Sequence, residues 1–270
     1  MVVNGMKEAP AVVGHYGMPD IVERMLGGLA AAGYDTGDPT VEMFNLADQM
    51  HGGGLNATKI QAKAAGIAGS MRVLDAGCGI GGSSRYLAHT YGCRVEAIDL
   101  TPEFVAAAVR LNALCGLDDR IAVREGSVTD LPYENGSFDQ VWSQNVTMNV
   151  ADKPRMFAEA YRVLKPGGRF SFTHLAQGPA GEPYYPLPWA RDAGYSFLGT
   201  PEEILQALRD AGFAKVEHLT EVSMPGRRPP DDLGATVVMG TDMPQRQANA
   251  ARSTKEGRLL PMLVLVERGS

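Results

Sequence analysis

The stretch that decides the fold is Val73-Leu74-Asp75-Ala76-Gly77-Cys78-Gly79-Ile80-Gly81-Gly82. Its apolar beginning predicts a short buried strand. Its glycines predict a tight turn that can approach a ligand closely, because glycine has no Cβ to hold the backbone away. Residues 83–91 follow with helical spacing, Leu87 and Tyr91 lying four apart on one face. A strand, a glycine-rich turn and a helix in this order predict the first unit of an α/β sheet.

Strands and helices alternate through much of the rest of the chain. Helices are expected at residues 101–115, 153–164 and 201–211, and further strands at 94–98, 121–124, 138–142, 169–173, 215–222 and 261–267. This alternation indicates βαβ units and a parallel sheet. Because such crossovers are right-handed, the prediction is an α/β fold with an open, doubly wound, Rossmann-like sheet.

Three segments fall outside the alternating pattern. Residues 1–70 predict a helical N-terminal cap or lid, with helices at 21–32, 41–50 and 58–67, ahead of a main domain at 71–270. Two cap insertions are expected in that domain, near 176–199, which is rich in Pro, Tyr and Trp, and near 224–256, a polar loop with one helix. Such additions commonly cover the ligand crevice at the carboxyl ends of the strands.

Composition is that of an ordinary globular protein, with 270 residues, 44% hydrophobic and 21% charged. No run approaches the roughly 18 apolar residues of a membrane span, and no secretory leader is evident, so a cytoplasmic protein without a membrane partner is expected. The net charge of −6 argues against a nucleic-acid partner. The densest basic spot contains Arg227 and Arg228, predicted to be solvated loop residues or contacts to an anionic substrate.

The three cysteines, Cys78, Cys93 and Cys115, match no zinc spacing and suggest no disulfide framework. We therefore expect no metal site, and interpret these thiols as buried apolar packing.

Polar residues follow the ends of four predicted strands. Asp99 comes 22 residues after Gly77, at the end of the second strand, where an acid can accept hydrogen bonds from both hydroxyls of a ribose. Residues 126–132 follow the third strand, and Ser143-Gln144-Asn145 ends the fourth. In a doubly wound sheet these strand ends meet in one crevice. The glycine spacing G-x-G-x-G-G departs from the G-x-G-x-x-G dinucleotide fingerprint.

Several motifs, taken in their order along the chain, resemble those of one known enzyme family. The glycine turn, Ile98-Asp99-Leu100, Asp130-Leu131-Pro132 with Phe138-Asp139, and residues 162–168 (Arg-Val-Leu-Lys-Pro-Gly-Gly) resemble class I S-adenosylmethionine-dependent methyltransferases over about residues 70–222. Within that group the chain is most similar to small-molecule enzymes of the sarcosine/dimethylglycine and ubiquinone/menaquinone-biosynthesis type, which residues 49–55 also fit. The resemblance implies a seven-stranded, mostly parallel sheet with an antiparallel last strand, and S-adenosyl-L-methionine as the cofactor.

The resemblance also implies which residues hold the methionine end of the cofactor. Gly77 and Gly79 would lie against it, with Asp75 near its amino group and Asn145 near the methionine moiety and the methyl group. His51, in a glycine-rich loop, would close over the carboxylate or remain an ordinary loop histidine.

The adenosine end has its own implied contacts. Asp99 would bind the ribose, Leu100 would pack on the adenine, and Ser127 with Val128 would flank the adenine edge. Many relatives carry aspartate where Ser127 stands, so a serine hydroxyl there is a departure from the family pattern.

Methyl transfer needs little side-chain chemistry. Attack on the sulfonium carbon expels a neutral thioether, so catalysis can come largely from holding the nucleophile in line. A general base is needed only when the nucleophile carries a proton at neutral pH. His174 is the candidate base, and Asn145 the second candidate catalytic residue. The alternative for His174 is a hydrogen bond to a backbone carbonyl.

Substrate contacts are expected near the methyl site and in the aromatic insertion. Met148 follows the fourth strand, and Trp189 and Arg191 lie in the insertion, where Arg191 could pair with a carboxylate. Tyr184 and Tyr185 are interpreted first as packing onto the core.

The predicted function is methyl transfer to an amine, hydroxyl or carbon nucleophile of a small molecule, a natural product or an amino-acid-like metabolite. The alternatives are a nicotinamide-dependent oxidoreductase on a similar sheet, a nucleic-acid or protein methyltransferase, and a non-catalytic cofactor-binding protein. The N-terminal helices could cap the site or form a subunit contact, so an oligomer stays open.

Overall fold

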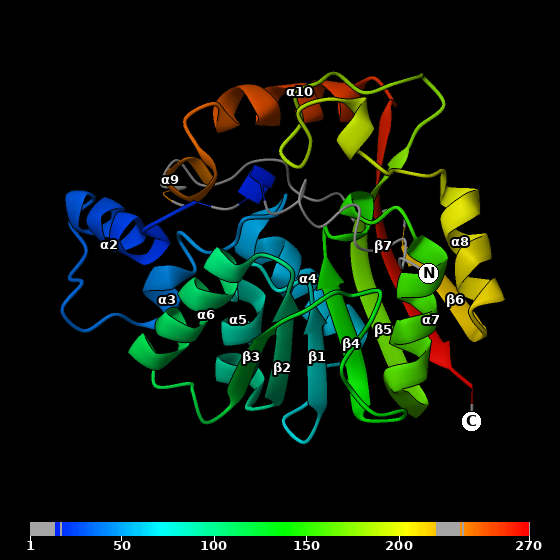
Figure 1. The fold of residues 1–270 in the computed structure, drawn as a ribbon, viewed down its shortest axis with the longest axis horizontal. Coiled ribbons are helices and arrows are strands. Elements are labelled where there is room, and N and C mark those ends of the chain that lie inside the picture. The colour runs from blue at the N-terminus through cyan, green and yellow to red at the C-terminus, as the bar shows by residue number, and fades with distance from the viewer. Residues whose placement is uncertain (1–13, 17, 220–232, 234, 270) are drawn as a thin grey trace.

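The computed structural model describes residues 14–16, 18–219, 233 and 235–269. Its seven-stranded sheet has the order β3-β2-β1-β4-β5-β7-β6 (Figure 1). The strands are β1 Arg72–Ala76, β2 Arg94–Asp99, β3 Ile121–Glu125, β4 Phe138–Gln144, β5 Leu164–Gln177, β6 Phe213–Leu219 and β7 Leu259–Arg268. The α/β prediction is confirmed. Arg227, Arg228 and the last three residues of the expected strand at 215–222 lie outside the described residues.

Strand directions separate this sheet from a dinucleotide-binding one. Strands β1 to β5 pair in parallel, whereas β7 runs antiparallel to both β5 and β6. The antiparallel last strand is thus confirmed, and it lies between β5 and β6. A dinucleotide-binding sheet has the order 3-2-1-4-5-6 without this strand.

Helices cover both faces of the sheet. The helices are α2 Ile21–Ala31, α3 Val41–Phe44, α4 Gly54–Ala65, α5 Gly82–Tyr91, α6 Pro102–Leu114, α7 Lys153–Val163, α8 Pro201–Asp210, α9 Ala235–Met239 and α10 Met243–Lys255. Alternate strand residues face opposite sides, so Val264 packs under α7 and α8 while Leu263 packs under α4 and α5. Helices α2 and α3 lie against α6.

Local sequence signals explain several helix starts. Thr200 begins α8 with a capping box, since its Oγ1 accepts from the Glu203 N–H at 3.2 Å and its own N–H donates to the Glu203 carboxylate at 2.8 Å. Asp152 begins α7 by accepting from the Arg155 N–H at 3.0 Å. Both helices were predicted within about a residue.

Three predicted elements differ from the structure. The expected helix at 41–50 ends at Phe44, because the chain turns there to bring Asp48 and Gln49 into the interior. The helix expected at 58–67 begins earlier, at Gly54. The insertion near 224–256 has two helices in its described part rather than one, separated by Gly240, whose φ is 106°. Helix α10 crosses the end of the sheet where the parallel strands finish (Figure 1).

No helix in the described ranges combines the length and the apolar character that crossing a bilayer would require.

Candidate active site

A cavity of about 670 Å³ lies at the carboxyl ends of the parallel strands, beneath α10. It brings together nearly all the residues predicted for the site. Those that line it are His51, Asp75, Gly77, Gly79, Asp99, Leu100, Ser127, Val128, Asn145, Met148, His174 and Trp189. Arg191 does not line it. The strand-end prediction therefore located one common crevice.

The glycine turn forms one wall of the cavity from bare backbone. Gly77, Gly79 and Gly81 have φ values of 84°, 55° and 82°, which residues with a Cβ rarely adopt. A Cβ on Gly77 would clash with Val146, and one on Gly79 would lie 3.2 Å from the Met50 methyl group. Glycine is therefore required here by the left-handed backbone and by close packing against Val146 and Met50, and Gly77 and Gly79 present backbone to the cavity.

Asp99 lies directly against this turn. Its Oδ2 accepts a hydrogen bond from the Gly79 N–H at 2.8 Å, and its Oδ1 accepts one from the Thr101 N–H at 2.9 Å. Burial raises the pKa of this carboxyl, and the backbone donors oppose the rise. A carboxylate has about four lone-pair sites. Each oxygen can therefore still accept a hydrogen bond, which suits the two hydroxyls of a ribose.

Asp75 is buried at the end of β1 and lines the same wall. Its Oδ2 accepts a hydrogen bond from the Ser84 hydroxyl at 2.6 Å. Burial raises the pKa of Asp75 to about 7, with Ser84 opposing the rise and the charge of Asp99 adding to it. A ligand ammonium group beside Asp75 would favour its ionised form.

Comparisons with known proteins agree with this geometry. Residues 74–172 match the model of a methyltransferase domain family. The sarcosine/dimethylglycine N-methyltransferase of Halorhodospira halochloris is 40% identical over 144 residues, which are 53% of this chain and 52% of that protein. A geranyl diphosphate methyltransferase solved with S-adenosylmethionine is 26% identical, with a TM-score of 0.63, over 78% of this chain and 84% of that one.

The chain is therefore similar to class I methyltransferases, and residues 74–172 match their methyltransferase domain. It spans about half the length of the Halorhodospira relative. The cyclase SpnF shares the fold at 23% identity and a TM-score of 0.65, over 94% of each chain, so the fold by itself does not define a reaction. The cofactor of these enzymes, S-adenosylmethionine, fits this site. The cavity lined by the Gly77 and Gly79 backbone has space for it, Asp99 offers free lone pairs, and Asp75 suits an ammonium group.

A buried polar cluster beside the cavity was not predicted. Thr58 Oγ1 donates to Gln49 Oε1 at 2.7 Å and lies 3.1 Å from His51 Nε2. Ser83 donates a short hydrogen bond to Gln144 Oε1. The Gln144 amide nitrogen is buried without a partner among the described residues, and Gln144 lines the cavity. The sequence signal for Gln144 was its position directly before Asn145, at the end of the fourth strand.

A buried ion pair was also missed. Asp48 and Arg85 are 2.9 Å apart with both side chains fully buried, and Asp48 lines the cavity. Burial raises the pKa of Asp48, and the Arg85 guanidinium opposes the rise. Arg85 also donates to Asn112 at 3.0 Å. The pair connects the N-terminal segment to α5 beside the glycine turn. The sequence signal for this pair was an arginine on the inner face of α5.

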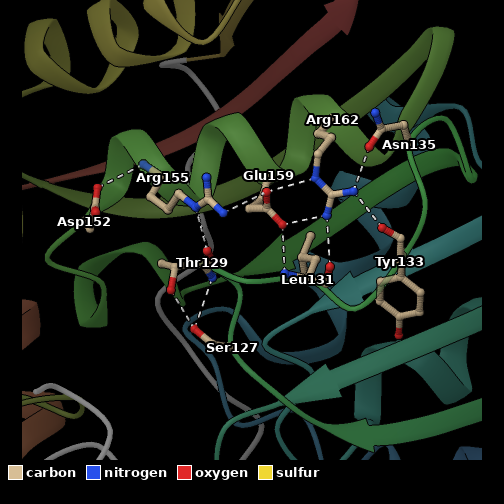
Figure 2. Close-up of polar contacts among 9 residues, drawn as sticks. All are labelled: Ser127, Thr129, Leu131, Tyr133, Asn135, Asp152, Arg155, Glu159 and Arg162. Carbon is tan, nitrogen blue, oxygen red and sulfur yellow. Dashed lines mark hydrogen bonds and ion pairs between the residues drawn. The ribbon is translucent and has the colours of Figure 1, made fainter. Parts of the chain in front are cut away.

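Helix α7 holds the loop that carries Ser127 and Val128 (Figure 2). Glu159 accepts from the Leu131 N–H at 2.9 Å, and Arg162 donates to the Leu131 carbonyl at 2.9 Å. The Ser127 hydroxyl is 2.8 Å from the Thr129 hydroxyl. The motifs at residues 130–132 and 162–168 thus meet through Arg162, which positions the loop along the cavity.

The two candidate catalytic residues differ in character. His174 is buried inside β5, and its Nε2 donates to the Leu198 carbonyl at 2.7 Å. Burial lowers the pKa of His174 to about 3, assisted by Lys153. This geometry favours the carbonyl-bonded alternative over a strong base. Asn145 has a φ of 53° and accepts from the Thr173 hydroxyl at 3.0 Å. A left-handed non-glycine residue at a cavity wall is typical of functional sites.

The aromatic insertion contributes one of its two predicted contacts. Trp189 is buried, lines the cavity and donates to the Ser196 hydroxyl at 2.9 Å. Arg191 is exposed, because the short bridge between Leu187 and Ala190 turns Trp189 inward and leads the chain back to the surface. The structure therefore does not bring Arg191 into the cavity lining, and its contact with a substrate stays a prediction. Tyr184 stacks under Arg252, with 3.8 Å between the guanidinium carbon and the ring centre.

Tyr16, from the N-terminal segment, also lines the cavity and was missed. Burial raises the pKa of its hydroxyl, which is hydrogen-bonded to the Asn149 side chain. Its ring lies 5.7 Å from that of Phe104. Tyr16 lies far along the chain from Phe104 and Asn149, so the local sequence gave no signal of these contacts.

Proposed function

We propose that the protein transfers the methyl group of S-adenosylmethionine to a small molecule held in the same cavity. The observation that carries this proposal is the continuity of one cavity from Asp99 and the glycine turn to Met148 and Trp189. A cofactor on the Asp99 side and an acceptor on the Trp189 side would then share a single space. The match of residues 74–172 to a methyltransferase domain supports the same reaction.

S-adenosylmethionine, when bound, supplies an electrophilic methyl carbon on a sulfonium whose departure needs no acid. The protein would fix that group at both ends. Asp99 would accept hydrogen bonds from the ribose hydroxyls, Asp75 would pair with the ammonium group, and the Gln144 amide would donate to the carboxylate. Asn145, held by Thr173, would lie near the methyl group. Rate enhancement then comes chiefly from orientation.

Proton removal has a limited place in this scheme. A histidine whose pKa is about 3 holds a proton poorly, so His174 accepts a hydrogen bond better than it accepts a proton. The Tyr16 hydroxyl, whose pKa is raised, stays neutral and can orient an acceptor. We infer that the site positions its acceptor rather than deprotonating it strongly.

We further propose a biosynthetic role in the cytoplasm, with no nucleic-acid substrate. A net charge of −6 supports the absence of a nucleic-acid substrate, since proteins bind phosphate backbones through basic faces. Residues 1–70 are proposed as a cap on the catalytic domain at 71–270, consistent with Tyr16 and His51 reaching the cavity.

The test combines binding with transfer. S-adenosylhomocysteine should bind in isothermal titration calorimetry while NADH does not, and label from methyl-labelled S-adenosylmethionine should enter a low-molecular-weight product. Binding of NADH alone would favour the oxidoreductase alternative. Binding of S-adenosylhomocysteine without any labelled product would favour the non-catalytic alternative, for which the cyclase is a precedent in fold.

A further inference from the structure

One group of residues that line the cavity is apolar and packs together. Met148, Leu175, Trp189 and Ala250 line the cavity and pack in a single apolar cluster. Pro261 lines it too and pairs with Leu175 in the β5–β7 register. We call these five residues the apolar chamber. Apolar walls favour an apolar ligand, because burying apolar surface stabilises the complex.

Carboxylates that could neutralise a cationic acceptor are absent from the apolar chamber. Within the described ranges, three acids line the cavity, and each already has partners. Asp48 pairs with Arg85 at 2.9 Å, Asp75 accepts from Ser84, and Asp99 accepts from two backbone N–H groups. An ammonium ion in the chamber would be desolvated without a counter-charge, which is strongly unfavourable.

Cations that could bind a carboxylate are equally scarce there. Among the described lining residues, Lys255 is the one lysine or arginine, and its side chain is exposed on α10. Arg191 is exposed and does not line the cavity. A zwitterionic amino acid would therefore lack partners for both of its charges inside the chamber.

Neutral polar groups do reach the edge of the chamber. Tyr16 and Asn149 line the cavity and are hydrogen-bonded to each other. His174 has a buried Nδ1 with no partner in the described part of the chain, and its Nε2 proton goes to Leu198, so Nδ1 is an acceptor. These groups suit one neutral hydrogen-bonding function on an otherwise apolar molecule.

We propose that the apolar chamber selects an uncharged, mainly apolar acceptor carrying a neutral polar group such as a hydroxyl, and excludes amino acids and small ammonium compounds. This inference rests on the proposed methyl transfer and narrows its substrate class. It departs from the substrate named for the Halorhodospira relative.

The test uses matched probes on protein saturated with S-adenosylhomocysteine. 4-Ethylphenol and 2-naphthol represent the proposed class, and L-tyrosine carries the same phenol with a zwitterion added. Sarcosine represents the small ammonium compounds. In calorimetric titrations, the two uncharged probes should bind at least tenfold more tightly than L-tyrosine or sarcosine.

Two variants of α10 locate the binding. Ala250→Trp should fill the chamber and weaken 4-ethylphenol binding at least tenfold while S-adenosylhomocysteine affinity stays within twofold. Ala248→Trp, exposed on the same helix and outside the cavity, should leave both affinities unchanged.

The outcomes separate this inference from the proposed function. Equal or tighter binding of sarcosine or L-tyrosine, no binding of the uncharged probes, or binding unaffected by Ala250→Trp would overturn the substrate class alone. Failure of the wild type to bind S-adenosylhomocysteine would overturn the proposed function first.

Discussion

Replacing Asp99 with asparagine removes one of two acceptor oxygens while keeping the size of the side chain. Both oxygens now accept backbone N–H groups, from Gly79 and from Thr101. In Asp99→Asn, the new NH₂ group must face one of those donors, and one ribose hydroxyl loses its acceptor. A hydrogen bond to a charged group contributes about 1.5–3 kcal/mol. Loss of one such bond predicts S-adenosylhomocysteine binding weakened roughly 10- to 150-fold.

Isothermal titration calorimetry at pH 8 measures this effect. Asp119→Asn is the matched control, because it makes the same charge change at an exposed position outside the cavity. The control should bind like the wild type. If Asp99→Asn bound S-adenosylhomocysteine within twofold of the wild type, Asp99 would not hold the ribose.

Three further predictions follow from buried charges. Because the pKa of Asp75 is about 7, S-adenosylhomocysteine affinity should fall below that pH by up to about tenfold per unit, and Asp75→Asn should flatten this dependence. Because the pKa of His174 is lowered to about 3 in the folded protein, its contribution to stability is present above about pH 6.5 and is lost as the pH falls. In urea titrations, the free energy of unfolding of the wild type should therefore fall between pH 7 and pH 5 by about 2 kcal/mol more than that of His174→Gln. His89→Gln, at an exposed position, should keep the wild-type difference. Arg85→Met leaves a buried carboxylate unpaired and should cost about 3–5 kcal/mol in chemical denaturation, whereas Arg110→Met, in an exposed pair, should hardly move the midpoint; equal effects would contradict the role of burial.

Local sequence signals were enough to predict most of the fold. The glycines at 77, 79 and 81 predicted a turn because few other residues adopt their positive φ, and the helices expected at 153–164 and 201–211 match α7 and α8 within about a residue. What remained unpredicted depends on distant packing. The helix expected at 41–50 stops early because Asp48 is drawn inward to Arg85, a residue 37 positions away.

The candidate site divides in the same way. Asp75, Asp99 and Asn145 could be predicted because parallel strands end at one edge of a sheet. Tyr16 could not, because its role depends on segments that meet only in three dimensions. The strand-end position of Gln144 was predicted, but its contact with Ser83 was not, because Ser83 lies on a separate helix. Arg191 lies outside the cavity lining, since the residue composition of the aromatic insertion does not fix which side chains its turns direct inward.

A crystal structure of the complex with S-adenosylhomocysteine would test the cofactor cleft most directly. We predict both ribose hydroxyls about 2.6–3.2 Å from the Asp99 carboxylate, with the sulfur facing Met148 and Trp189. Ligand bound away from the glycine turn, or a ribose that leaves Asp99 untouched, would contradict the account.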